Sequence, residues 1–271
     1  MNIGELEFSR YWKDGWRGYV RVGYEGLFGN IAEWLNGKAD VVLSAKCRKV
    51  LRHETSRGVV YSKLMWAQND QAITEGLPHK WLKWAFGRSR AVLILKTTSK
   101  MIARGHLCPE PLLAVRKLQP NGWHLNLLVT AEIKEPTVEA LVLGGDKDAV
   151  KRAGRELALL HADEFVHGDF LPRNSCLGNG KFYFLDNDKS RHWIKAPFFL
   201  QRRNLDQFTY NLMYLKGTDC CRKELPMAFL ESYAEAAKWD EERKKYEFVR
   251  IMEKAEKRWK KEACKNKTSD K

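Results

Sequence analysis

Most strand-like segments of this chain come before residue 133, and most helix-like segments come after it. Residues 40–45, 48–53 and 58–65 are rich in β-branched and apolar residues and are separated by short turns, so they predict an antiparallel meander. Residues 112–117 and 125–133 predict two further strands. A chain that separates strands from helices in this way is typical of an α+β fold, and 271 residues are enough for two lobes.

The helices are predicted from apolar spacing and from capping residues. Residues 89–104 form a helix-like segment with Ser89 as its N-cap and Gly105 at its end. Residues 137–143 and 148–161 predict two more helices, and the chain from about Arg202 onwards has helical character. We therefore expect three parts, which are an irregular, aromatic-rich segment docked on the body (1–38), an N-lobe (39–133), and a C-lobe with a basic C-terminal helix (134–271).

The most specific motif is H-G-D-x-x-x-x-N at 167–174, which is followed by a short apolar segment ending in Asp186. Phosphoryl transfer needs a carboxylate that accepts or orients the proton of the attacking hydroxyl, and oxygen ligands for a metal that neutralises the phosphates. This pattern predicts Asp169 as the base, with Asn174 and Asp186 as Mg²⁺ ligands. Asp188 is a reserve candidate, because along an extended strand it would point the same way as Asp186. A turn closed by local Asp and Asn bonds is the alternative.

A cation for the phosphates is the second requirement of this chemistry. Lys63 lies inside the predicted strand 58–65, in the half of the chain where a kinase carries its phosphate-binding lysine. A lone lysine in a strand usually faces solvent, so the prediction for Lys63 depends on the order of the segments around it.

Several motifs resemble the lipopolysaccharide core kinase family, which comprises the Kdo and heptose kinases of the protein-kinase-like superfamily, and more distantly the RIO and aminoglycoside-type kinases. The matching segments are K-C-R-K-V-L-R (46–52), G-V-V-Y-S-K (58–63), L-L-V-T-A-E-I (127–133), H-G-D-F-L-P-R-N (167–174), F-L-D-N-D-K-S-R (184–191) and R-R-N-L-D-Q-F (202–208). The resemblance implies a bilobal fold that uses ATP and Mg²⁺. It implies phosphate contacts from Lys63 and Lys46, an adenine-binding hinge at Glu132 and Ile133, and transfer of the γ-phosphate to a sugar hydroxyl of a lipid-linked saccharide.

Two features depart from the kinase pattern. No glycine lies between Asp40 and Arg57, so the glycine-rich phosphate loop is missing. Lys46, Arg48 and Lys49 could replace it with side-chain contacts, or they could form a solvated basic hairpin. The predicted helix 89–104 has no acidic residue to pair with Lys63, and Glu75 from the preceding segment is a candidate.

The formal net charge of +14 favours an anionic partner, such as a phosphorylated substrate, an acidic lipid surface or nucleic acid. Residues 254–267 hold seven basic and two acidic residues, and they could lie on anionic lipid or form a solvated helix. We predict no membrane span and no secretory signal, and hence a cytoplasmic protein that could be peripheral on the inner membrane. The cysteine spacing predicts neither a zinc site nor a disulfide framework.

Three functions remain open at this point. The first is a sugar kinase of the lipopolysaccharide core. The second is a kinase of another class, either RIO-like or acting on a small molecule. The third is a pseudokinase or a basic nucleic-acid-binding scaffold, which is disfavoured because Lys63, Asp169, Asn174 and Asp186 are all present. The sequence makes no prediction of oligomeric state.

Overall fold

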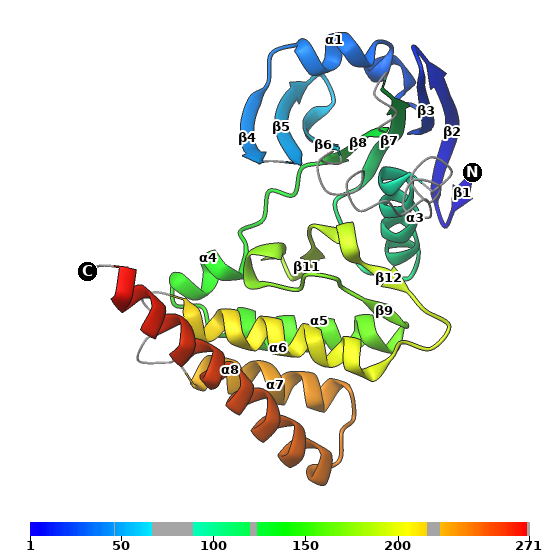
Figure 1. The fold of residues 1–271 in the computed structure, drawn as a ribbon. Coiled ribbons are helices and arrows are strands. Elements are labelled where there is room, and N and C mark those ends of the chain that lie inside the picture. The colour runs from blue at the N-terminus through cyan, green and yellow to red at the C-terminus, as the bar shows by residue number, and fades with distance from the viewer. Residues whose placement is uncertain (46, 67–88, 120–123, 216–222, 270–271) are drawn as a thin grey trace, which may run out of the picture. The chain divides into compact units, whose positions relative to one another are not determined.

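The computed structural model describes residues 1–45, 47–66, 89–119, 124–215 and 223–269 (Figure 1). The chain divides into two compact units, Met1–Ile133 and Lys134–Lys271. Unit 1 contains the large sheet, and unit 2 is mainly helical. In the described part of the chain, no helix is both long and apolar enough to cross a membrane.

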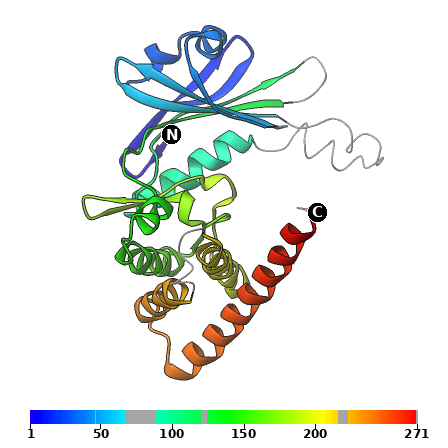
Figure 2. The ribbon, with the colours of Figure 1, turned by 90° about the vertical axis from the view of Figure 1, so that its left-hand side faces the viewer.

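Unit 1 is built on one antiparallel sheet of eight strands in the order β1-β2-β3-β7-β8-β6-β5-β4. Its strands are β1 (Asn2–Ile3), β2 (Leu6–Lys13), β3 (Trp16–Arg21), β4 (Asp40–Ala45), β5 (Arg48–Thr55), β6 (Gly58–Met65), β7 (Pro111–Leu118) and β8 (His124–Ala131). Its helical elements are η1 (Glu25–Phe28), α1 (Ile31–Asn36) and α3 (Arg90–Ala103). Figures 1 and 2 show α1 and α3 on opposite faces of the sheet.

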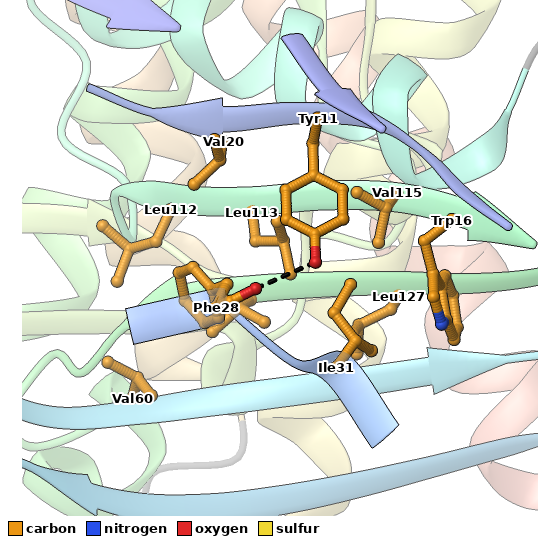
Figure 3. Close-up of a cluster of buried hydrophobic side chains, with 11 residues drawn as sticks. Tyr11, Trp16, Val20, Phe28, Ile31, Val60, Leu112, Leu113, Val115 and Leu127 are labelled. Carbon is orange, nitrogen blue, oxygen red and sulfur yellow. Dashed lines mark hydrogen bonds between the residues drawn. The ribbon is translucent and has the colours of Figure 1, made fainter. Parts of the chain in front are cut away.

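Both faces of the central strands are buried, which explains the nearly continuous apolar run of β7. Leu113 and Val115 point to the face covered by η1 and α1, whereas Ala114 points to the face covered by α3. Figure 3 shows the first of these clusters, in which the buried Tyr11 hydroxyl donates a 2.9 Å hydrogen bond to the carbonyl of Phe28. This bond ties η1 to the sheet.

The first 38 residues are part of the sheet and not an irregular docking segment. The strand β2 pairs with β3, and β3 pairs with β7, so the N-terminal hairpin extends the sheet at that edge. The hairpin turns at Asp14 and Gly15, which both have positive φ, as the two-residue Asp-Gly turn requires. The many aromatic and glycine residues conceal the alternation of apolar and polar side chains in this segment. The Asp-Gly pair, which is typical of a two-residue hairpin turn, could have predicted the hairpin from the sequence.

Most of the predicted elements of unit 1 are confirmed. The strand predicted at 58–65 is β6, which pairs with β5 and β8, and those predicted at 112–117 and 125–133 correspond to β7 and β8. The predicted N-cap of α3 is also correct, because the Ser89 hydroxyl accepts a hydrogen bond from the amide of Val92 at 3.4 Å. Gly105 follows the helix with φ of +87°.

Unit 2 is a group of helices with short strands at one edge. Its elements are α4 (Val138–Leu143), α5 (Asp148–Ala162), β9 (Phe165–Val166), η2 (Pro172–Asn174), β10 (Ser175–Gly178), β11 (Lys181–Phe184), η3 (Asn187–Lys189), β12 (Arg191–His192), α6 (Phe198–Tyr214), α7 (Glu224–Ala236) and α8 (Glu241–Ser269). The helix α5 packs on α7, and α6 packs on both α7 and α8. The loops that follow α5 are carried by two short antiparallel pairs, the hairpin of β10 with β11 and the pairing of β9 with β12.

The apolar face of the basic helix α8 is covered by protein. Ala255 is buried and Trp259 is partly buried, and both pack against Tyr210 and Met213 of α6. These residues therefore stabilise unit 2. Of the two alternatives for the tail, insertion of Ala255 and Trp259 into lipid is disfavoured, because these two side chains already pack on α6.

Candidate active site

The H-G-D-x-x-x-x-N segment forms a loop between β9 and β10 that is closed by its own asparagine. The side-chain amide of Asn174 donates a 2.9 Å hydrogen bond to the backbone carbonyl of Asp169. The backbone amide of Asn174 donates to the carbonyl of Leu171, also at 2.9 Å. The predicted base and the predicted metal ligand are thus held together within one short loop.

Asp186 is brought to the same loop by backbone hydrogen bonds. The strand β11 pairs antiparallel with β10, so that Phe184 lies opposite Ser175. The next residue, Leu185, donates its amide to the carbonyl of Asn174 at 2.9 Å and accepts a 2.9 Å hydrogen bond from His167 Nε2. Asp186 directly follows this doubly held residue. The structure therefore brings Asp169, Asn174 and Asp186 together.

Asp186 has an unusual backbone conformation, with φ of 52° and ψ of 54° in the left-handed region. Residues other than glycine held there typically cost about 1–3 kcal/mol and are common at functional sites. A buried turn supports it, because the Asn187 side chain donates to the Phe184 carbonyl at 3.1 Å and accepts from the Ser190 hydroxyl at 3.2 Å. The expectation for Asp188 was wrong, because the chain turns at Asp186 into η3 and does not continue as a strand.

His167 fixes the geometry of the loop as a neutral imidazole. Burial lowers its pKa below the ordinary value, and the carboxylates of Asp169 and Asp186 oppose this only in part. The backbone amide of Asp169 donates to His167 Nδ1 at 3.2 Å, so Nδ1 is the unprotonated nitrogen. Nε2 therefore carries the hydrogen that it donates to the carbonyl of Leu185.

A buried chain of polar side chains, here called the relay, holds the loop from behind. Asn204 of α6 donates its amide to the carbonyl of His167, and its Oδ1 accepts from His161 Nε2 at 3.1 Å. His161 Nδ1 in turn accepts from the hydroxyl of Tyr233 of α7 at 2.8 Å. Burial lowers the pKa of His161 to about 4, so this imidazole is neutral at pH 7. The relay links three helices to the candidate active site, and no sequence motif pointed to its role.

Gly168 is required by close packing beneath the loop. A Cβ atom built on Gly168 would lie 2.0 Å from the Lys189 Cβ and 2.5 Å from its carbonyl carbon. No side chain fits there without a backbone shift. This contact explains why the motif reads H-G-D in this chain.

A pocket of about 430 Å³ lies beside Gly168, the neighbour of Asp169. Its lining includes three cationic residues and two large aromatic ones, which are Lys189, Arg191, Arg203, Trp193 and Phe199. In the part of the chain that the structure describes, the buried indole N–H of Trp193 has no hydrogen-bond partner. The ring of Phe199 is 68% exposed, so it offers apolar area to a ligand. The pocket combines positive charge, a hydrogen-bond donor and aromatic surface.

The remaining predicted residues belong to unit 1 or lie outside the described residues. Lys63 lies on β6, between Val50 of β5 and Leu128 of β8. Glu132 accepts a 3.2 Å hydrogen bond from the hydroxyl of Tyr61, and its amide donates to a β6 carbonyl. Ile133 is the last residue of unit 1. Lys46 and Glu75 are outside the described residues.

The donor set of the loop fits Mg²⁺, which prefers oxygen ligands and is often held by one or two carboxylates. Asn174 uses its Nδ2 for the carbonyl of Asp169, which leaves Oδ1 as the end suited to a cation. Asp186 supplies a carboxylate, and it directly follows Leu185, whose amide donates to the carbonyl of Asn174. Among the described residues, no group of three or more histidine, cysteine and acidic side chains is arranged for a metal. The two candidate ligands, Oδ1 of Asn174 and the carboxylate of Asp186, are both oxygen groups, which is the ligand type that Mg²⁺ prefers.

The β-rich N-lobe, the helical C-lobe and the H-G-D loop define a protein of the bilobal, protein-kinase-like α+β fold, as predicted. A solved structure described as WaaP in complex with acyl carrier protein matches it with a TM-score of 0.58 and 15% sequence identity. The match covers 87% of this chain and 96% of that chain. Because 1089 chains of known structure match, the fold alone does not select an activity. No protein-family model and no curated protein sequence matches the chain.

Proposed function

We propose that the chain is an ATP- and Mg²⁺-dependent kinase that phosphorylates a hydroxyl group of a lipopolysaccharide core sugar, either Kdo or heptose. The observation that carries this proposal is the hydrogen-bonded loop that joins Asp169, Asn174 and Asp186. The fold, which matches that of the structure described as WaaP, supports the kinase class, and the resemblance of residues 167–174 and 184–191 to the lipopolysaccharide core kinases supports the class of acceptor.

In this proposal Asp169 accepts the proton of the attacking sugar hydroxyl. The sugar oxygen then forms a bond to the γ-phosphorus of ATP while the bond from that phosphorus to the bridging oxygen breaks, and ADP leaves. The side-chain amide of Gln207 lies 3.5 Å from one carboxylate oxygen of Asp169 and helps to orient it. The neutral His167 and the closing bond of Asn174 keep the loop in one shape. Such pre-ordered positioning is the main contribution that a kinase makes to phosphoryl transfer.

Asn174 and Asp186 would hold Mg²⁺, which would neutralise negative charge on the phosphates of ATP. The left-handed backbone of Asp186 sets the direction in which its side chain leaves the chain, and the hydrogen bond of Asn187 holds this turn. The carboxylate of Asp186 would therefore be positioned for the metal before nucleotide binds. On the nucleotide side, we propose that Lys63 and Lys46 contact phosphate and that the backbone at Glu132 and Ile133 binds adenine.

The pocket beside Gly168 is proposed to receive the acceptor. Its cations, Lys189, Arg191 and Arg203, suit a sugar that carries carboxylate or phosphate groups. The indole N–H of Trp193 would donate to a sugar oxygen, and the exposed ring of Phe199 would pack against apolar carbons of the saccharide. An acceptor held here would lie against His167 and Gly168, the two residues that precede Asp169 in the loop.

We also propose that the protein is cytoplasmic and works peripherally at the inner membrane, where a lipid-linked acceptor would lie. The net charge of +14 supports this, because a basic protein is attracted to anionic lipid. The attraction would come from exposed cations and not from the apolar face of α8, which packs on α6.

The proposal is tested by measuring ATP turnover with Mg²⁺, with and without extracted lipopolysaccharide core. We expect acceptor-stimulated turnover from the wild type and at least about a hundredfold less from Asp169→Ala, because general-base catalysis contributes about 10²–10⁴ in rate. Asp148→Ala removes an exposed carboxylate from the start of α5 and is the matched control. Near-normal turnover by Asp169→Ala would show that the base is assigned wrongly.

A further inference from the structure

A second pocket, of about 530 Å³, lies in unit 1 between α3 and the strands β2, β3 and β7. Its volume is within the range of about 300–1,000 Å³ that is common for small-molecule sites. Its lining is cationic and partly aromatic, and the residues that matter here are Arg10, Trp12, Arg17, Lys96 and Arg116. None of these residues has a part in the proposed transfer of phosphate.

The alternation of β2 explains why the pocket forms where it does. Leu6 and Phe8 are buried in the cluster that α3 covers. Arg10 and Trp12 continue the same face of the strand, since side chains two residues apart point the same way. The face thus changes from apolar to cationic within one strand, and the cationic end lines the pocket.

Two arginines lie directly opposite each other on neighbouring strands beside this pocket. Arg17 of β3 lies opposite Arg116 of β7 in the strand register. Directly opposed like charges destabilise a sheet. Within the described residues, Arg10, Arg17 and Lys96 form no ion pair with a carboxylate, and the pocket lining contains no acidic residue. The charges of these three residues are therefore not neutralised by a carboxylate in the described part of the chain.

Gly18 brings the two strands unusually close beside this pair. A Cβ atom at Gly18 would lie 2.0 Å from the backbone oxygen of Ala114. The close contact between β3 and β7 needs a residue without a side chain at this position. It holds Arg17 and Arg116 on neighbouring strands at short range, which is an arrangement suited to one shared anion.

Trp12 adds a flat surface at the edge of the pocket. Its side chain is 76% exposed, and the guanidinium of Arg17 lies 4.6 Å from the ring centroid. The ring therefore helps to fix the position of Arg17. A fixed guanidinium loses less conformational entropy when it binds a phosphate group.

We propose that this pocket is a second binding site, for a small ligand that carries more than one phosphate group. Arginine forks bind phosphate oxygens in pairs, and Lys96 on α3 adds a charge from the helix side. A ligand bound here contacts both the sheet and α3, so it stabilises the packing between them. The proposal does not depend on the proposed kinase activity, because no residue of the transfer site takes part.

The test uses pyrophosphate as the probe and isothermal titration calorimetry on the full chain without Mg²⁺. The double variant Arg10→Gln/Arg17→Gln should bind pyrophosphate at least about tenfold more weakly at one site, because each lost charge-assisted contact is worth about tenfold or more. Lys13→Gln is the matched control, since it removes the same charge from the opposite face of β2. It should bind as the wild type does.

The position of the site is tested by comparing the change in tryptophan fluorescence that pyrophosphate causes in the wild type and in Trp12→Phe. Pyrophosphate should change the emission of the wild type, and this change should be reduced in Trp12→Phe. Inorganic phosphate, titrated in parallel, should bind more weakly than pyrophosphate, and equal affinity for the two would contradict a site for more than one phosphate group. Equal affinity in the wild type and the double arginine variant would overturn the proposal, whatever the turnover assay shows.

Discussion

The relay behind the active-site loop makes a quantitative prediction about stability and pH. The pKa of His161 is lowered to about 4 in the folded protein, against an ordinary value of 6.5. Between these two values the unfolded chain binds a proton at His161 and the folded chain does not. Acid therefore favours the unfolded state, and the stability contributed by a neutral His161 is lost as pH falls below about 6.5.

The magnitude follows from the pKa difference and the size of the pH step. Each pH unit below the unfolded pKa changes the free energy of unfolding by about 1.4 kcal/mol per group. A step from about pH 7.5 to about pH 5 covers about one and a half such units, so His161 should account for about 2 kcal/mol of lost stability. His167, whose pKa is also lowered by burial, adds a loss of the same sign.

The assay compares the urea unfolding of the wild type with that of His161→Gln at both pH values. A glutamine can donate to Asn204 Oδ1 and accept from the hydroxyl of Tyr233, but it does not titrate. The loss on acidification should therefore be about 2 kcal/mol smaller in the variant, while the contribution of His167 cancels in the difference. His192→Gln replaces an exposed histidine and should behave as the wild type. Equal losses in the wild type and His161→Gln would refute a buried, neutral His161.

Three further predictions test separate parts of the molecule. Gly168→Ala places a methyl group against Lys189, so it should lower the free energy of unfolding by about 1–3 kcal/mol and reduce turnover. A normal free energy of unfolding together with normal turnover would contradict the close contact. Asp186→Ala should weaken the binding of nucleotide in the presence of Mg²⁺ but not in its absence, as measured by calorimetry, whereas equal weakening in both would exclude a metal role. Tyr11→Phe removes the buried bond to Phe28 and should lower the free energy of unfolding by about 1 kcal/mol without changing turnover, which urea unfolding and kinetics can check.

Local patterns in the sequence predicted the central elements of the fold well. The strand β6 and the cap of α3 at Ser89 depend on neighbouring residues, so composition and spacing were sufficient. The strands β2 and β3 were missed because irregular aromatic residues hide their alternation, and only the turn at Asp14 marks the hairpin. The prediction for Asp188 failed because sequence alone does not show that Asp186 adopts a left-handed conformation.

The candidate active site was predictable only where its residues are close in sequence. Asp169 and Asn174 belong to one motif, and Asp186 follows at a recognisable distance. The relay joins His161 to Asn204 and Tyr233, which are 43 and 72 positions away. Contacts over such separations arise from the packing of α5, α6 and α7, so no local pattern in a single sequence reveals them.

The central claim is that Asp169 directs transfer of the γ-phosphate of ATP to a sugar hydroxyl. The most direct measurement incubates the protein with γ-labelled ATP, Mg²⁺ and lipopolysaccharide core, and follows the label into the saccharide for the wild type, Asp169→Asn and the control Asp148→Ala. We predict a labelled sugar phosphate from the wild type and Asp148→Ala, and at least about a hundredfold less from Asp169→Asn. Label that enters the saccharide at equal rates with all three proteins, or that enters the saccharide with none of them, would contradict the claim.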